Sequence, residues 1–214
     1  MKRTNKNPLI VISIILLILF LIILIDILTT KQITKLDILV YKNISQIQTP
    51  ILTKIFIFIT NFGATIPLII LTILLSLILL IRKKYSHLIL LISSMLIGVI
   101  LELSIKILVH RLRPEHALIP ITKYSFPSGH ATMAIIFFSI LSYSIVEHIK
   151  NKTKILLTSI TLILILLIGF SRIYLGVHWF SDVLGGLILG LFINSTILLV
   201  LEYLYKKKRW NLKN

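Results

Sequence analysis

Two basic side chains in the middle of the chain have the spacing of a site for an anion. Lys106 and Arg113 lie seven residues apart, which is two helical turns, so both would share one helical face if the helix continues that far. A cation at membrane depth is costly unless it faces a cavity or a partner. Two cations that face one cavity would suit an anion with several oxygens, such as a phosphate.

A second polar stretch runs from Phe126 to His130 and directly precedes an apolar run. This order predicts the start of a helix, with Ser128 as its N-cap. Gly129 would let a ligand approach the backbone, where free N–H groups and the helix dipole favour an anion, and His130 would stand beside that anion. Taken alone, the same residues also read as a simple turn and helix cap.

The third polar stretch runs from Ser171 to Asp182. Arg172 supplies another cation, and His178 and Asp182 lie one helical turn apart. A carboxylate at this spacing can accept a hydrogen bond from one imidazole nitrogen, which leaves the other nitrogen free as a nucleophile. For this pair alone, a satisfied His–Asp pair at a capped helix start is the better explanation.

Together the three stretches resemble, position for position, the signature of the type-2 phosphatidic acid phosphatase and vanadium haloperoxidase superfamily. Its first element, Lys, six residues and Arg-Pro, is matched from Lys106 to Pro114. Its second, Pro-Ser-Gly-His, is matched from Pro127 to His130. Its third, Ser-Arg, five residues, His, three residues and Asp, is matched from Ser171 to Asp182. No position of the signature departs from the pattern.

The resemblance implies a role for each matched side chain. His178 would attack phosphorus and become phosphorylated, Asp182 would orient it, and His130 would protonate the leaving oxygen and later activate water. The phosphoryl oxygens would be held by Lys106, Arg113, Arg172, Ser128 and the Gly129 N–H. None of these steps requires a metal or another cofactor, so we expect none.

The elements that must position these stretches are membrane helices. Of the 214 residues, 57% are hydrophobic, and the mean hydropathy of +1.02 is far above that of a soluble domain. A crossing needs about 20 apolar residues. We therefore expect an all-α fold, a polytopic six-transmembrane-helix bundle in one domain, 1–214. The predicted helices are Pro8–Leu28, Gly63–Ile81, His87–Val109, Gly129–Val146, Ile155–Phe170 and Asp182–Tyr205.

Six crossings place both termini on one side of the membrane and the three polar stretches on the other. Most of the 23 Lys and Arg residues fall on the side of the termini, at the two ends of the chain and in Arg82–Lys84 and Lys150–Lys154. This bias predicts cytoplasmic termini and a site at the outer face. The high Ile, Lys and Asn content is typical of an AT-rich prokaryotic genome and suggests that the membrane is the plasma membrane. The segment from Lys31 to Lys54 mixes apolar and charged residues, and we expect it to lie in the outer interface, bordering the access route for lipid.

The membrane setting favours a lipid phosphate as substrate. A molecule with an apolar tail can reach the site within the leaflet, and the short loops leave no room for a soluble substrate domain. Undecaprenyl diphosphate, phosphatidylglycerophosphate and phosphatidate are candidates that the sequence does not separate. Phosphotransfer to another lipid and non-catalytic binding of lipid phosphates are the alternatives, and the presence of both His178 and His130 argues against pure binding.

Composition excludes several other classes. The net charge of +16 would suggest nucleic-acid binding in a soluble protein, but the basic residues flank apolar segments and no nucleic-acid motif accompanies them. We therefore expect membrane lipids as partners and no nucleic acid. The chain has no Cys, which excludes disulfides and Cys-ligated metals. Halide oxidation is not expected, although vanadate should inhibit as a phosphate mimic.

A few further residues carry weaker predictions. Glu102 precedes Lys106 by one turn, and we hypothesise that the two pair. Gly186 and Gly190 have a spacing that we interpret as close packing within the bundle rather than dimerisation. Four ionisable residues near the first stretch but outside the signature are interpreted as interfacial: His110, Arg111, Glu115 and His116.

Overall fold

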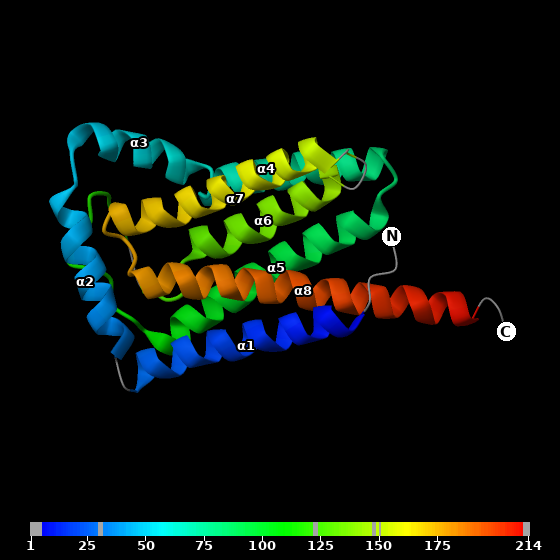
Figure 1. Ribbon diagram of the computed structural model, residues 1–214, viewed down its shortest axis with the longest axis horizontal. Coiled ribbons are helices and arrows are strands. Elements are labelled where there is room, and N and C mark those ends of the chain that lie inside the picture. The colour runs from blue at the N-terminus through cyan, green and yellow to red at the C-terminus, as the bar shows by residue number, and fades with distance from the viewer. Residues whose placement is uncertain (1–5, 30–31, 122–123, 147–148, 150, 212–214) are drawn as a thin grey trace.

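A computed structural model of the chain describes residues 6–29, 32–121, 124–146, 149 and 151–211. All regular structure within these residues is α-helical, which confirms the predicted fold class. Figure 1 shows an elongated bundle with one helix lying across its end. The helices are α1 (Lys6–Leu28), α2 (Gln32–Gln46), α3 (Pro50–Asn61), α4 (Thr65–Ile81), α5 (Tyr85–Val109), α6 (Gly129–Val146), α7 (Asn151–Tyr174) and α8 (Phe180–Asn211).

Six stretches of the described chain are long and apolar enough to cross a membrane, as predicted. They form helices because a backbone in hydrocarbon must satisfy its own hydrogen bonds. Four helices exceed the predicted bounds: α1 and α5 each start two residues earlier, and α7 and α8 are longer at both ends. Long polar side chains can reach out of an apolar layer, so an apolar run underestimates the length of its helix.

The second of these stretches starts earlier than the predicted Gly63. It runs from Pro50 to Ile81 and contains both α3 and α4. Thr49 caps α3, because its side chain accepts a hydrogen bond from the N–H of Leu52 at 3.3 Å, and Pro50 occupies the first turn. The predicted interfacial segment therefore ends inside α3 rather than before a helix.

A turn at residues 62–64 separates α3 from α4 and lies against α7. A Cβ atom at Gly63 would lie 2.6 Å from the side chain of Ile168, so only glycine allows this close approach. The turn matters for the site because α3 packs along α7, whose last turns carry part of the third polar stretch.

Helix α2 runs across the end of the bundle, at the left of Figure 1. Val40 and Ile44 pack against a small cluster that includes Ile173 of α7 and Val183 of α8. On its other side, Leu36 and Leu39 are exposed. This amphipathic helix, perpendicular to the bundle, has the arrangement expected of a segment at a membrane surface.

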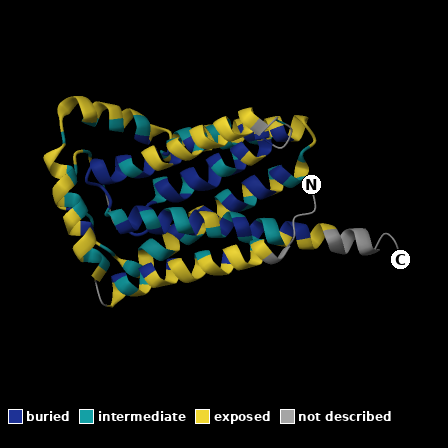
Figure 2. Cartoon of the chain, in the orientation of Figure 1, coloured by how far each residue is buried: buried dark blue, intermediate teal, exposed yellow. Residues whose placement is uncertain are grey.

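Burial is greatest in α6, which the other helices surround (Figure 2). Of the residues in the apolar span of α6, 56% are buried inside the protein, against 17% in the most apolar parts of α1 and α7. Helix α8 packs closely on α6 at its two spaced glycines. A Cβ at Gly186 would lie 2.7 Å from the carbonyl oxygen of Ser128, and one at Gly190 would lie 2.8 Å from that of Thr132. The interpretation of these glycines as packing residues is confirmed.

The beginning of α1 and the end of α8 lie at the same end of the bundle (Figure 1). The end of α5 and the start of α6 lie at the opposite end, beside α2. This arrangement agrees with the predicted six crossings. Two residues named in the topology prediction, Lys31 and Lys150, lie outside the described residues.

Candidate active site

The three polar stretches meet at the end of the bundle that α2 covers (Figure 1). The first follows the end of α5, the second forms the start of α6, and the third connects α7 to α8. The backbone ties two of them together, because the N–H of Ser128 donates to the carbonyl oxygen of Asp182 at 3.0 Å. The convergence expected from topology is therefore present in the tertiary structure.

The first stretch does not meet the condition under which both cations would share one helical face, because the helix does not continue as far as Arg113. Helix α5 ends at Val109, and His110 adopts a left-handed conformation with φ of 50°. Arg113 consequently lies in the loop, where the following Pro114 disfavours helical backbone. Its guanidinium still reaches the third stretch, since Nη1 donates to the carbonyl oxygen of Val177 at 2.5 Å.

Lys106 remains on α5 and forms an ion pair with Glu102, which confirms the hypothesised pair. The start of α6 comes close to both side chains. A Cβ at Gly129 would lie 2.7 Å from a carboxylate oxygen of Glu102 and 3.6 Å from Nζ of Lys106. Glycine at this position therefore lets the lysine approach the N-terminus of α6, where an anion would be stabilised.

Ser128 directly precedes α6, in the predicted N-cap position. Its side chain is fully buried, and its Oγ lies 3.5 Å from the N–H of Ala131, the third residue of the helix. His130, in the first turn of α6, is close enough to interact electrostatically with four predicted site residues. These are Arg172, His178, Lys106 and Arg113. The structure thus brings His130 to the same centre as the other predicted residues.

Arg172 stands in the last turn of α7 and is 5% exposed. Its Nη1 donates to Oγ1 of Thr60 at 2.8 Å, while its Nε is buried and has no hydrogen-bond partner among the described residues. A buried donor without an acceptor is costly. An anion bound at the site would supply that acceptor.

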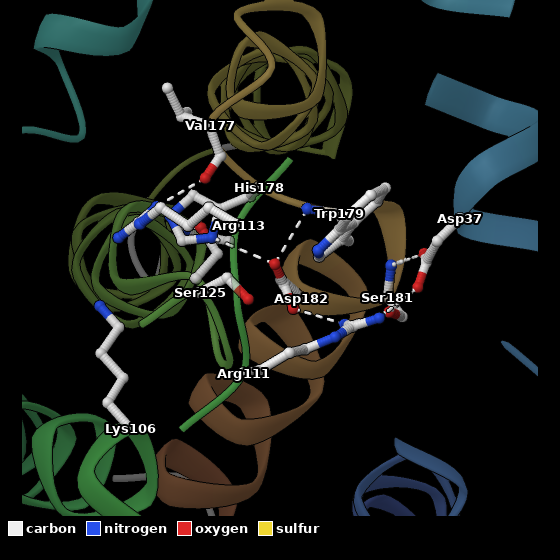
Figure 3. A network of polar contacts seen from close by, with 12 residues as sticks. Asp37, Lys106, Arg111, Arg113, Ser125, Val177, His178, Trp179, Ser181 and Asp182 are labelled. Atoms are coloured by element: carbon white, nitrogen blue, oxygen red, sulfur yellow. Dashed lines mark hydrogen bonds and ion pairs between the residues drawn. The ribbon is translucent and has the colours of Figure 1, made fainter. Parts of the chain in front are cut away.

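His178 is almost completely buried between two groups of opposite charge (Figure 3). Its Nδ1 lies 3.4 Å from Oδ2 of Asp182, and its Nε2 lies 3.1 Å from Nη1 of Arg113. The arginine can only donate, so Nε2 is the acceptor and the ring proton lies on Nδ1. The spacing of His178 and Asp182 predicted that the carboxylate would face one of the two ring nitrogens, and in the structure that nitrogen is Nδ1.

Burial lowers the pKa of His178 to about 4, and the nearby cations of Arg113 and Arg172 act in the same direction, against the effect of Asp182. The imidazole is therefore neutral at pH 7 and keeps its lone pair on Nε2. Burial also lowers the pKa of Arg113, while the charges of Asp182 and Glu102 oppose that shift.

Sequence reasoning missed three residues behind Asp182. Arg111 is not merely interfacial, because its side chain is 10% exposed and pairs with both Asp182 and Asp37 of α2 at 2.6 Å. Ser181 joins the same network through Asp37. The available signal was Asp37, one of seven acidic residues in the chain, but its partners lie more than 70 residues away in sequence.

The other three residues interpreted as interfacial are exposed. They are His110, Glu115 and His116. The ring of His110 stacks edge-on against Tyr124, with centroids 4.3 Å apart.

Among the described residues, no group of three or more His, Cys, Asp and Glu side chains could hold a metal ion.

Comparisons with known proteins agree with this site. A family model described as the PAP2 superfamily matches residues 87–207. An undecaprenyl-diphosphatase of Sulfolobus acidocaldarius is 31% identical over 189 residues, which cover 84% of this chain and 86% of that protein. Phosphatidylglycerophosphatase B of Bacillus subtilis is 41% identical over 86 residues, which cover 39% of this chain and 42% of that protein.

The fold is also similar to a solved structure. The crystal structure of a transmembrane PAP2-type phosphatidylglycerolphosphate phosphatase from Bacillus subtilis has a TM-score of 0.80 and 30% identity, covering 86% of this chain and 93% of that one. Because the family model spans all three polar stretches and more than half of the chain, this protein belongs to the PAP2 superfamily, as a multi-pass membrane protein whose relatives are phosphatases.

Proposed function

We propose that this protein hydrolyses the phosphoryl group of a lipid phosphate or diphosphate, with His178 as the nucleophile. The observation that carries the proposal is the setting of the His178 ring, with Asp182 at Nδ1 and a lone pair on Nε2 that faces Arg113. A neutral, oriented imidazole beside several cations is the arrangement that in-line attack on a phosphoryl group requires.

The reaction would proceed in two steps. Nε2 of His178 attacks phosphorus, the bond from phosphorus to the lipid oxygen breaks, and His130 donates a proton to that oxygen. In the second step His130 takes a proton from water, whose oxygen attacks the phosphohistidine and releases phosphate. Asp182 stabilises the positive charge that develops on the imidazole in the first step.

The cations would bind the oxygens of the phosphoryl group. Arg113 already stands beside Nε2, and Arg172 has a buried Nε without an acceptor. Lys106 lies close to Gly129, at the start of α6, where free backbone N–H groups are also present. Positive charge around the equatorial oxygens stabilises a phosphoryl transition state without a metal ion.

The substrate class follows from position in the bundle. The site lies at one end of the membrane-length helices, beside the amphipathic α2, so a lipid headgroup could reach it while the tails stay in the leaflet. The distribution of Lys and Arg favours cytoplasmic termini, which would place the site at the outer face of a plasma membrane. Undecaprenyl diphosphate, phosphatidylglycerophosphate and phosphatidate are the candidate substrates, and two of them appear in the names of relatives.

The test is phosphate release by the purified protein in detergent with a chelator present, from the three candidate lipids in parallel. The variant His178→Ala should release none, whereas His116→Ala, which changes an exposed histidine at the same end of the bundle, should behave as the wild type. Release that survives His178→Ala would contradict the mechanism. If the substrate lipid loses its phosphate, no free phosphate appears in solution and a second lipid becomes phosphorylated, the reaction is phosphotransfer.

A separate experiment tests for the phosphohistidine intermediate. Lipid labelled with ³²P on its terminal phosphate, mixed rapidly with enzyme and quenched in base, should leave label on the wild-type chain and none on His178→Ala. Binding of the lipid without label or release would favour the non-catalytic alternative.

A further inference from the structure

Asp37 is a buried carboxylate in a helix that otherwise lies at the surface of the bundle. It is 1% exposed, although α2 has exposed leucines on its other face. Both of its oxygens are engaged by residues near the nucleophile. Oδ1 accepts from the N–H of Ser181 at 2.9 Å, and Oδ2 accepts from the Ser181 hydroxyl and from Arg111, each at 2.6 Å.

Arg111 connects this carboxylate to the one that orients the nucleophile. Its Nη2 donates to Asp37, while its Nη1 donates to Oδ1 of Asp182 at 2.6 Å and to the hydroxyl of Ser181 at 2.7 Å. The remaining oxygen of Asp182 accepts from the N–H of Trp179 at 2.9 Å and faces Nδ1 of His178. Figure 3 shows this continuous path from α2 to the imidazole.

We infer that Asp37 and Arg111 are positioning residues for phosphoryl transfer, which hold the Asp182 carboxylate so that one oxygen faces Nδ1 of His178. Neither residue touches the reacting atoms. The inference rests on the proposed function, because it assigns a purpose to the orientation of the proposed nucleophile.

The charges explain why both residues are needed. Asp182 is fully buried, and a buried carboxylate is stable only with a compensating partner. Arg111 supplies that partner through a planar fork that can donate in two directions at once. Asp37 accepts the hydrogen bond from Nη2 of Arg111. The guanidinium therefore cannot direct both of its terminal nitrogens at Asp182 and draw that carboxylate away from the imidazole.

The path also makes α2 part of the active site. The site has its full set of contacts only when α2 is docked across the end of the bundle, because the carboxylate of Asp37 comes from that helix. Val40, one turn further along α2, packs against the Ile173 and Val183 cluster and is absent from the network of hydrogen bonds. It therefore provides a matched variant that loosens α2 without changing any charge.

The test compares Asp37→Asn, Arg111→Lys and Arg111→Gln with the control Val40→Ala, in steady-state hydrolysis and in inhibition by vanadate. Misplacement of a catalytic pair by about 1 Å can cost about 100-fold in rate, so Asp37→Asn should lower kcat by about 10- to 100-fold with KM changed less than about threefold. Arg111→Gln should have a larger effect, and Arg111→Lys should restore part of the loss by retaining the charge.

Inhibition by vanadate separates positioning from a loss of structure. The oxyanion is held by the cations on the other side of the ring, so the vanadate inhibition constant should stay within about threefold of wild type in Asp37→Asn. A kcat of Asp37→Asn equal to that of Val40→Ala would overturn the inference, as would a parallel loss of vanadate binding and activity. If Asp37→Asn does not purify as a folded protein, the same criteria apply to Arg111→Lys.

A double-mutant cycle gives a second criterion. Because both residues act through Asp182, Asp37→Asn combined with Arg111→Gln should lose clearly less activity than the product of the single losses. Multiplicative losses would contradict a shared path. An inactive wild type, or activity that His178→Ala leaves unchanged, would instead reject the proposed function.

Discussion

The two sides of the His178 ring have different surroundings (Figure 3). On the Nδ1 side, every carboxylate oxygen of Asp182 and Asp37 has a partner within the protein, and Arg111 is shared between them. On the Nε2 side, three cations come together near Glu102, and the buried Nε of Arg172 has no acceptor among the described residues. The three cations are Lys106, Arg113 and Arg172.

This difference separates two tasks that a nucleophile in a membrane protein requires. On the Nδ1 side the Asp182 carboxylate is fixed by its own partners in the free protein and lies 3.4 Å from Nδ1, so it can orient the ring before any substrate arrives. The Nε2 side gathers positive charge that an added anion would help to balance, because buried cations are costly unless they are paired. Changes on the Nδ1 side should therefore affect turnover, and changes on the Nε2 side should affect binding of the anion as well.

The largest expected effect is that of Asp182→Asn, on the Nδ1 side. An amide neither stabilises the imidazolium nor favours the required tautomer, so kcat should fall by about 1,000-fold. The vanadate inhibition constant should stay within about threefold of the wild-type value, because the cations are unchanged. Steady-state kinetics with and without vanadate measure both quantities. Equal losses of turnover and vanadate affinity would show that the two sides are not separate.

A smaller effect on turnover, but a larger one on binding, is expected for Arg172→Gln on the Nε2 side. Loss of one cation from a buried phosphoryl site should lower kcat/KM by about 100-fold and weaken vanadate inhibition by at least about tenfold. The control is Lys54→Gln, which removes a cation from α3 that takes no part in the network. Unchanged vanadate affinity in Arg172→Gln would remove this arginine from the phosphate site.

Thr60→Val should have an effect of only several-fold. This change removes the hydroxyl that accepts from Nη1 of Arg172 at 2.8 Å but preserves the shape of the side chain. A neutral hydrogen bond contributes about 1 kcal/mol, so kcat/KM should fall by about fivefold through a less ordered guanidinium. Thr53→Val on the same helix α3 is the matched control, and it should leave kcat/KM unchanged. Equal losses in both variants would point to α3 packing rather than to Arg172.

The smallest expected effect is a dependence of stability on pH. The pKa of His178 is about 4 in the folded protein and about 6.5 in an unfolded chain, so the unfolded state binds more protons between these values. This contribution to stability is complete above about pH 6.5 and is lost as the pH falls toward 4. The melting temperature in detergent should therefore fall more between pH 7 and pH 5 for the wild type than for His178→Gln. An identical drop would mean that the imidazole is not buried in its neutral form.

Local sequence was sufficient for much of the molecule. Runs of apolar residues predicted the membrane-spanning helices, since a backbone in hydrocarbon has few alternatives. Lys106 and Glu102 pair because helical geometry places residues four apart on one face. The spacing of His178 and Asp182 likewise predicted their contact, and topology alone brought the three polar stretches to one end.

Tertiary structure decided what local geometry could not. Arg113 reaches His178 from a loop, because α5 ends at Val109, where the apolar run also ended, and His110 adopts a left-handed conformation that turns the chain back. The contacts of Arg111 with Asp37 and of Arg172 with Thr60 join residues 74 and 112 positions apart in the chain. Such pairs depend on how α2 and α3 dock against α7 and α8, and docking is determined by the packing of whole helix faces rather than by the residues that it brings together.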